Sequence, residues 1–253
     1  RQGRIRWKLA IATTAVLALG LAGYLLSPAI PGQSRLAYVV IWLAVTGGVA
    51  VLIALSFWRQ LAVLGLAMLS GGLLTVCFAP WSFWPVAYVA LIPFVWACHI
   101  GQGSKATVWL IGLAGVAYWA TSLYWLTWIT AVGHAAGTSY IAMYWVVAAW
   151  ALRRLLRGGW PCWLALPLVW VPLELLRNFF VPFPWFFLAH SQYMHTSLIQ
   201  ISDVTGQLGV SFFVAMVNGV LVDGVLMWIG GRPRGRMRLV VGGTVTAVCL
   251  AVM

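Results

Sequence analysis

The sequence predicts an all-α protein, a polytopic bundle of about nine transmembrane helices with its N-terminus in the cytoplasm. The chain has 253 residues, of which 63% are hydrophobic and only 7% are charged, a composition foreign to soluble domains. Several apolar runs reach the ~20 residues that cross a bilayer core as a helix. These runs are continuous rather than alternating, which excludes the strands of a β-barrel.

Short breaks of proline, glycine and basic residues separate the first five predicted spans. Ser27-Pro28 ends the first span, and Arg59 closes the second. Pro80 stops the third, while Lys105 precedes the fifth. The sequence therefore predicts spans over residues 9–26, 36–57, 61–79, 85–99 and 106–130.

Four further spans follow in the second half of the chain. The basic cluster 153–157 ends the sixth, and the basic loop Arg232–Arg238 separates the eighth from the ninth. Pro167 and Pro172 interrupt the seventh, so we expect a kink there. The predicted bounds are 139–152, 160–176, 208–229 and 239 to the end.

The basic residues predict the orientation. With the N-terminus inside, 13 of the 15 Lys and Arg residues fall on the cytoplasmic side, and only Arg35 and Arg177 fall outside, as the positive-inside rule requires. Segments 79–84, 130–138 and 177–207 are then expected on the outer face. Because the sequence starts without Met and stops inside an apolar run, we interpret it as a piece of a longer protein.

Charge and cysteine content bear on the function classes. The net charge of +12 is spread over short clusters between apolar runs, so no basic domain indicates nucleic acid as a partner. The cysteines form no CxxC pair, which favours small buried hydrophobes over a redox role. They are Cys77, Cys98, Cys162 and Cys249.

Polar residues collect in the stretch from Pro167 to Val220. Glu174 and Arg177 are three residues apart at the outer end of a predicted helix, so they share one face. They form either a local pair that closes the helix or a polar anchor for the following loop or a lipid headgroup. The cost of ionisable groups at membrane depth favours a functional role.

The loop after Arg177 offers further alternatives. His190 and His195 are five residues apart, a poor spacing for joint metal ligation on a helix, so we expect interfacial hydrogen bonds and no metal. The aromatic patch between 179 and 187 is either an interfacial belt or a re-entrant loop that guides acyl chains. Asp203 is either a helix cap or a substrate contact.

Three segments together carry a family resemblance. The first is FAPWSFWPVAYVALIPF (Phe78–Phe94), and the second is GLAGVAYWATSLYWLTWI (Gly112–Ile129). The third is the polar stretch, where Trp170, Glu174 and Arg177 resemble a W-x-x-x-E-x-L-R pattern. An F-P-W triplet, an H-S-Q triplet and a D-x-x-G-x-x-G-V-S-F segment follow. In this order, the segments resemble the membrane half of apolipoprotein N-acyltransferases, from about Leu61 to the end.

The resemblance implies an enzyme of the bacterial cytoplasmic (inner) membrane. Such an enzyme moves an acyl chain from a phospholipid donor, through a thioester, to the N-terminal diacylglyceryl-cysteine of a lipoprotein acceptor. It implies no cofactor, and it leaves the oligomeric state open. The implied lipid- and substrate-binding set comprises Trp81, Trp125, Glu174, Arg177, Phe183, Pro184, Trp185, His190, Ser191, Gln192 and Asp203.

The chain also departs from the family pattern. Pro182 replaces a usual Gly, and His190 replaces a usual Tyr. The nitrilase-like catalytic domain with its Glu–Lys–Cys triad is missing, so no catalytic residue is assigned and this chain alone is expected to be inactive. Residues 1–60 would form an extension with two helices, ahead of a family-like membrane domain at 61–253.

Two other functions compete with the acyltransferase. A multi-pass transporter is disfavoured because the chain has no internal repeat and few intramembrane charges. A non-catalytic membrane anchor for a partner domain is the second alternative. A nitrilase-like domain encoded after Met253 would support the enzyme, whereas a stop codon there would support the anchor.

Overall fold

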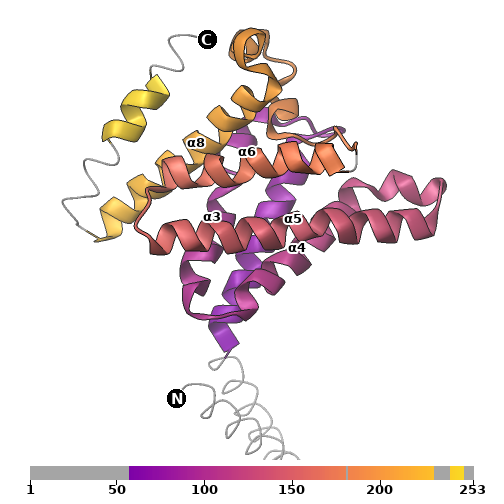
Figure 1. The fold of residues 1–253 in the computed structure, drawn as a ribbon, viewed down its shortest axis with the longest axis horizontal. Coiled ribbons are helices and arrows are strands. Elements are labelled where there is room, and N and C mark those ends of the chain that lie inside the picture. Colours follow the sequence, from indigo (N-terminus) through magenta and orange to yellow (C-terminus); the bar gives the residue numbers. More distant parts are fainter. Residues whose placement is uncertain (1–56, 181, 231–239, 248–253) are drawn as a thin grey trace, which may run out of the picture. The chain divides into compact units, whose positions relative to one another are not determined.

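The computed structural model describes residues 57–180, 182–230 and 240–247, and every regular element in them is helical (Figure 1). Among these residues, five helical segments are long and apolar enough to cross a membrane. A shorter apolar helix, α4, accompanies them. The prediction of an all-α, multi-pass protein is therefore confirmed. The first predicted span lies outside the described residues, as does nearly all of the second, so the count of nine and the cytoplasmic N-terminus stay predictions.

The elements follow one another with short connections. The five candidate spans are Phe57–Cys77, Trp84–Gly103, Ala131–Arg157, Cys162–Phe180 and Ser202–Ile229. In chain order, the labelled elements are η2 (Trp84–Tyr88), α3 (Ile92–Ile100), η3 (Gly101–Gly103), α4 (Ala106–Ser122), η4 (Tyr124–Trp128), α5 (Ala131–Arg157), α6 (Cys162–Phe180), η5 (Leu188–Gln192), α7 (Thr196–Ile199) and α8 (Ser202–Gly230).

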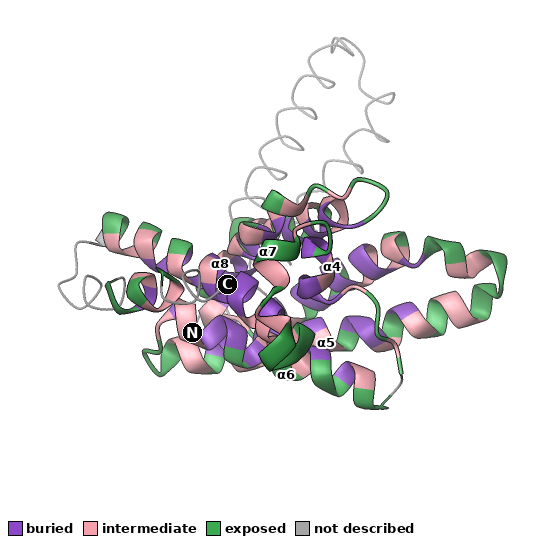
Figure 2. Ribbon diagram, turned by 90° about the horizontal axis from the view of Figure 1, so that it is seen from above, coloured by how far each residue is buried: buried purple, intermediate pink, exposed green. Residues whose placement is uncertain are grey.

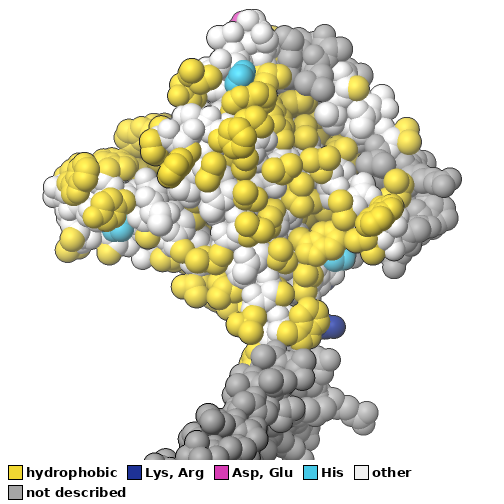
Figure 3. Space-filling model, turned by 180° about the vertical axis from the view of Figure 1, so that it is seen from behind, with side chains coloured by type: hydrophobic (Ala, Val, Ile, Leu, Met, Phe, Trp, Pro, Cys, Tyr) yellow, Lys and Arg dark blue, Asp and Glu magenta, His cyan; other side chains and the backbone are white. Residues whose placement is uncertain are grey.

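Among the labelled elements, the two most extensive helix contacts are α6 against α8 and α4 against α5. Small residues allow both close approaches, as is usual between membrane helices. A Cβ on Gly219 of α8 would collide with the Cys162 backbone, and one on Gly115 of α4 would lie 2.8 Å from Trp145 Cγ. Buried residues gather where these helices face one another (Figure 2). On the face shown in Figure 3, hydrophobic side chains cover most of the described surface.

The span Trp84–Gly103 is broken rather than continuous, unlike the predicted 85–99 run. Pro85 and Pro93 lie at the starts of its two helical pieces, η2 and α3. Asn218 of α8 bonds the backbone on both sides of the break, accepting from Leu91 N just before α3 (2.9 Å) and donating to Ala87 O in η2 (2.8 Å). Backbone groups freed inside a membrane need such an internal partner.

The predicted spans 106–130 and 139–152 have different bounds in the structure. The first ends as α4 at Ser122 and continues only as the 3₁₀ turn η4. The second begins earlier, because α5 starts at Ala131, where the Thr130 side chain accepts a hydrogen bond from Gly133 N (3.2 Å). Residues 131–138, which the predicted bounds left between two spans, are therefore helical, since this capping bond starts the helix ahead of the apolar run.

The later helices also extend beyond their predicted ends. α6 continues through Pro167 and Pro172 to Phe180. α8 begins at Ser202, six residues before the predicted start, but Gly206 breaks its first turns with φ 65° and ψ −176°. Only glycine adopts this conformation readily. Gly206 thus separates a short polar entry from the long apolar part of α8.

The end of the bundle opposite Arg177 is joined by two polar contacts. The buried Arg153 guanidinium on α5 donates through Nη2 to the carbonyl oxygens of Gly101, Gln102 and Ser104, at 2.8, 2.9 and 2.7 Å. Asp223 of α8 accepts a hydrogen bond from Trp163 N at the start of α6 (3.0 Å). Both contacts occupy backbone groups at helix ends, which otherwise lack partners.

Candidate functional site

Two of the three segments predicted on the outer face, 79–84 and 177–207, meet at one end of the described bundle. Tyr88 Oη donates to Gln192 Oε1 (3.2 Å), and the rings of Trp84 and His195 lie 3.9 Å apart. The loop 182–187 also approaches η4, where Trp125 and Trp185 pack edge to face at 6.3 Å. Loops far apart in sequence thus form one surface beside the ends of α4, α5 and α6.

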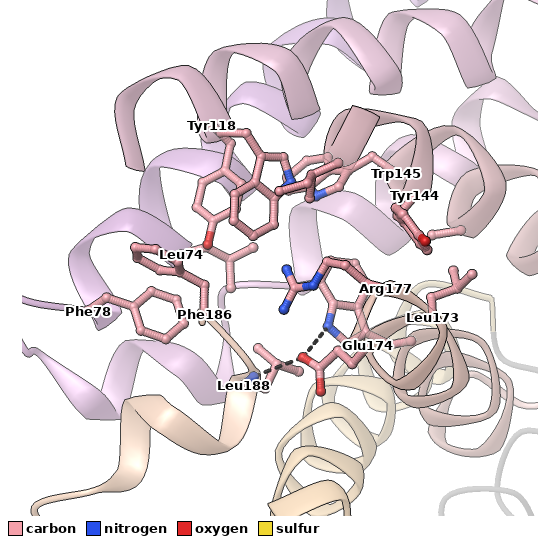
Figure 4. Close-up of a pocket in the computed structure, with 14 residues that line it drawn as sticks. Leu74, Phe78, Tyr118, Tyr144, Trp145, Leu173, Glu174, Arg177, Phe186 and Leu188 are labelled. Carbon is pink, nitrogen blue, oxygen red and sulfur yellow. Dashed lines mark hydrogen bonds between the residues drawn. The ribbon is translucent and has the colours of Figure 1, made fainter. Parts of the chain in front are cut away.

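A pocket opens beneath this surface, and the space among its lining side chains, open solvent included, is about 470 Å³. Figure 4 shows the two charged side chains of α6 in a space with aromatic rings on more than one side. Helix 57–77, α4, α5, α6 and the loop before η5 all contribute to its wall. The lining residues are Leu74, Phe78, Tyr118, Trp119, Ile141, Tyr144, Trp145, Ala148, Trp170, Leu173, Glu174, Arg177, Phe186 and Leu188.

Glu174 is buried, with 6% of its surface exposed. Its Oε1 accepts hydrogen bonds from Trp170 Nε1 (3.1 Å) and from Leu188 N (2.8 Å). The hydroxyl of Ser211 on α8 accepts a hydrogen bond from Ala189 N (3.0 Å), and the second carboxylate oxygen of Glu174, Oε2, has no hydrogen-bond partner. Glu174 therefore ties the start of η5 to α6 and keeps one oxygen unused.

Arg177 is also buried, with 4% exposed. Its guanidinium lies between the rings of Trp119 and Phe187, at 4.9 and 5.0 Å from their centroids. Nη2 donates to Trp185 O (2.7 Å), while Nε has no partner. The two ionisable side chains of α6 each form a hydrogen bond to the following loop. This arrangement matches the predicted loop anchor rather than a pair that merely closes the helix.

The loop 182–187 directs some of its side chains into the pocket wall and others to the protein surface. Phe186 has φ 59°, a strained conformation for a bulky residue, and its ring lies edge-on to Phe78 (5.1 Å) and Trp119 (5.8 Å) within the pocket wall. Pro184 and Trp185 are exposed, and Phe183 is partly buried against Trp185 (5.0 Å between centroids). The strained turn places one aromatic ring inside the pocket and another at the surface.

The side chains of the triplet His190-Ser191-Gln192 all form hydrogen bonds to other groups of the protein. Gln192 is fully buried and donates to Ser191 Oγ (2.8 Å) and Trp84 O (3.3 Å). His190 Nε2 pairs with Gln207 Oε1 (2.9 Å), and its ring stacks on Phe187. The described residues contain no group of three or more His, Cys, Asp or Glu side chains that could hold a metal ion.

Of the eleven predicted site residues, Pro184 and the triplet His190-Ser191-Gln192 do not line the pocket, and the other seven divide into three groups. Glu174 and Arg177 line the pocket, and Phe183 and Trp185 border it through their neighbours. Trp81, Trp125 and Asp203 are exposed and do not line it. Sequence reasoning missed five aromatic residues that form much of the pocket wall, because a Trp or Tyr on an apolar helix also fits a membrane interface. They are Tyr118, Trp119, Tyr144, Trp145 and Trp170.

The fold and site define a multi-pass helical membrane protein with an aromatic pocket that holds a buried acid and a buried arginine. The chain belongs to the apolipoprotein N-acyltransferase family, because residues 70–220, more than half of it, match the model of that family's N-terminal domain. This match includes every residue that lines the pocket.

Curated relatives agree with this assignment. The apolipoprotein N-acyltransferase of Geobacter metallireducens is 38% identical over 169 residues, 62% of this chain and 32% of its own length. The corresponding values are 30%, 60% and 29% for the Rhodopirellula baltica protein, and 32%, 72% and 38% for that of Methylococcus capsulatus. The chain thus spans about a third of the length of the relatives it matches.

Proposed function

We propose that this chain is the membrane part of an N-acyltransferase of the bacterial inner membrane. The reaction transfers an acyl chain from a phospholipid to the N-terminal diacylglyceryl-cysteine of a lipoprotein. One observation carries the proposal: the family-matched segment 70–220 encloses an aromatic pocket with Glu174 and Arg177 buried in it. Ionisable groups held at membrane depth are costly and typically serve function.

Within that reaction, the described residues would bind and orient lipid rather than make or break bonds. The covalent step requires an activated thiolate that takes the acyl chain as a thioester before the amine attacks it. The three cysteines in the described residues, Cys77, Cys98 and Cys162, are buried, and Cys249 lies outside the described residues, so we assign the thiolate role to none of the described cysteines. Holding two lipids in reactive geometry is a large contribution by itself.

The two competing functions fit the contacts less well. A transporter would use a broken helix to offer free backbone groups to its solute, yet Asn218 already occupies the groups freed in the span 84–103. A non-catalytic anchor gives no reason for an unpartnered Arg177 Nε in an aromatic pocket. The acyltransferase proposal gives a role both to the pocket and to the ionisable side chains that line it.

The decisive experiment expresses the full reading frame and measures acyl transfer from phospholipid to a synthetic diacylglyceryl-cysteine peptide in membranes. We expect an N-acylated peptide that mass spectrometry detects as one added acyl chain. Absence of transfer together with solute uptake by proteoliposomes would support the transporter and overturn the proposal.

Substitutions within the same assay test the role of the site. Glu174→Ala removes the acceptor for Leu188 N, and Trp185→Ala removes an aromatic face of the outer loop, so we expect each to reduce transfer about tenfold or more, equivalent to ~1.4 kcal/mol. Trp228→Leu changes a residue that is 85% exposed on α8 and serves as control. Control-level rates for Glu174→Ala and Trp185→Ala would remove both from the site.

A further inference from the structure

The end of the bundle opposite Arg177 carries exposed cations that lack an exposed acidic neighbour among the described residues. The chain has only three acidic residues. Glu174 and Asp203 lie toward the other ends of α6 and α8, and Asp223 is buried and accepts its hydrogen bond from Trp163 N. The exposed cations, which we call the cationic rim, are Lys105, Arg154 and Arg157.

The buried Arg153 holds the parts of the cationic rim together. Its Nη2 donates to Ser104 O (2.7 Å), which brings the next residue, Lys105, to the end of α5. Arg157 Nε donates to Arg153 O (3.1 Å). This bond uses one of the five N–H donors of the Arg157 guanidinium and fixes the side chain near the helix end. The cations therefore converge on one place in the fold.

The face of α5 that bears the two arginines continues into the membrane as an apolar stripe. The Arg154 guanidinium lies 5.3 Å from the ring centroid of Trp150, which is exposed. Val147 and Met143 are exposed too. Steps of three and four residues place all these side chains on one helix face. From the helix end inward, this face is cationic, then aromatic, then aliphatic.

This order matches the parts of a phospholipid. The 27 residues of α5 extend over about 40 Å, more than the ~30 Å hydrocarbon core, so its basic end reaches headgroup depth. Tryptophan favours that same depth, and a guanidinium pairs well with a phosphate. A soluble acidic protein would leave the aliphatic part of the stripe unused, which favours a lipid as the partner.

We propose that this face of α5 binds an anionic phospholipid, with the phosphate at Arg154 and Arg157 and an acyl chain along Val147 and Met143. A zwitterionic headgroup brings its own ammonium group, which the cationic rim repels. The rim therefore selects headgroups with a net negative charge, such as phosphatidylglycerol. None of these four residues lines the aromatic pocket. The inference is thus independent of the proposed acyl transfer.

The test compares two photoreactive lipids in phosphatidylcholine nanodiscs that hold the protein expressed from its full reading frame. One is a phosphatidylglycerol and the other a phosphatidylcholine, with the same diazirine in the same acyl chain. Mass spectrometry then counts adducts at residues 143–150. We expect about fivefold more adducts from phosphatidylglycerol at low salt, equivalent to ~1 kcal/mol. In 1 M NaCl the ratio should approach one, because salt screens exposed charges.

Two results of this comparison would overturn the proposal. Equal labelling at low salt would show that the face does not select anionic lipid, and would leave the cationic rim to a soluble acidic partner. A preference that persists unchanged in 1 M NaCl would show that charge does not cause it.

Two paired substitutions locate the preference. Arg154→Gln with Arg157→Gln removes both charges and should reduce the ratio to about one. Arg154→Lys with Arg157→Lys keeps both charges and is the matched control, in which at least half of the preference should remain. An unchanged ratio in the Gln pair, or a Lys pair as low as the Gln pair, contradicts the proposal. If the Gln pair does not fold, the salt series on the unaltered protein decides the question.

Discussion

Replacing Asn218 by leucine removes the internal partner of the broken span at nearly constant side-chain size. The amide is fully buried and forms three hydrogen bonds, to Leu91 N, Ala87 O and Val214 O. Leu91 and Ala87 are themselves fully buried, so the substitution leaves one donor and one acceptor without Asn218. Each such group costs about 1–3 kcal/mol.

The expected loss of stability is about 2–4 kcal/mol, near the lower end of the sum for two groups, because helices unfolded in a membrane find other partners. Titration of the detergent-solubilised full-length protein with sodium dodecyl sulfate, followed by tryptophan fluorescence, measures it. Asn178→Leu is the matched control, since it makes the same chemical change on α6 at a half-buried residue. If the free energies of unfolding of Asn218→Leu and of that control differ by less than ~0.5 kcal/mol, the hydrogen bonds across the break do not stabilise the fold.

The other two predictions concern helix contacts and use the same titration. Gly115→Ala places a Cβ 2.8 Å from Trp145 Cγ and should destabilise by about 1–3 kcal/mol, whereas Gly72→Ala meets no atom within 4 Å and should be neutral or slightly stabilising. Equal effects would disprove a close α4–α5 approach. Asp223→Ala removes the acceptor for Trp163 N and should cost ~1 kcal/mol, while Asp223→Asn should retain most of it. A full loss in the Asn variant would mean that charge, not the acceptor, is what matters.

Features that depend on composition and local pattern were accessible from the sequence. Continuous apolar runs predicted the helices, because the backbone N–H and C=O groups of a segment in lipid must be hydrogen-bonded within the protein. The placement of Glu174 and Arg177 on one helix face followed from their spacing. Both side chains line one pocket in the structure, as that shared face implies.

Features that depend on distant partners were not accessible. The break between η2 and α3 is stabilised by Asn218, more than 120 residues away in sequence, and no local pattern reveals that contact. The acceptor role of Glu174 likewise requires Leu188 N to be positioned by the loop. The pocket itself combines five segments, so the aromatic residues of α4 and α5 showed their shared role only once the helices were packed.

The left-handed backbone of Phe186 has a practical consequence for engineering this protein. Its conformation (φ 59°) suits glycine or asparagine better than phenylalanine, so a screen that rewards thermal stability alone could readily select replacements there. Those variants would lose the ring that contacts Phe78 and Trp119 in the pocket wall. Stabilisation and ligand binding are therefore opposed at this position, and a selection for robust variants should hold residue 186 fixed.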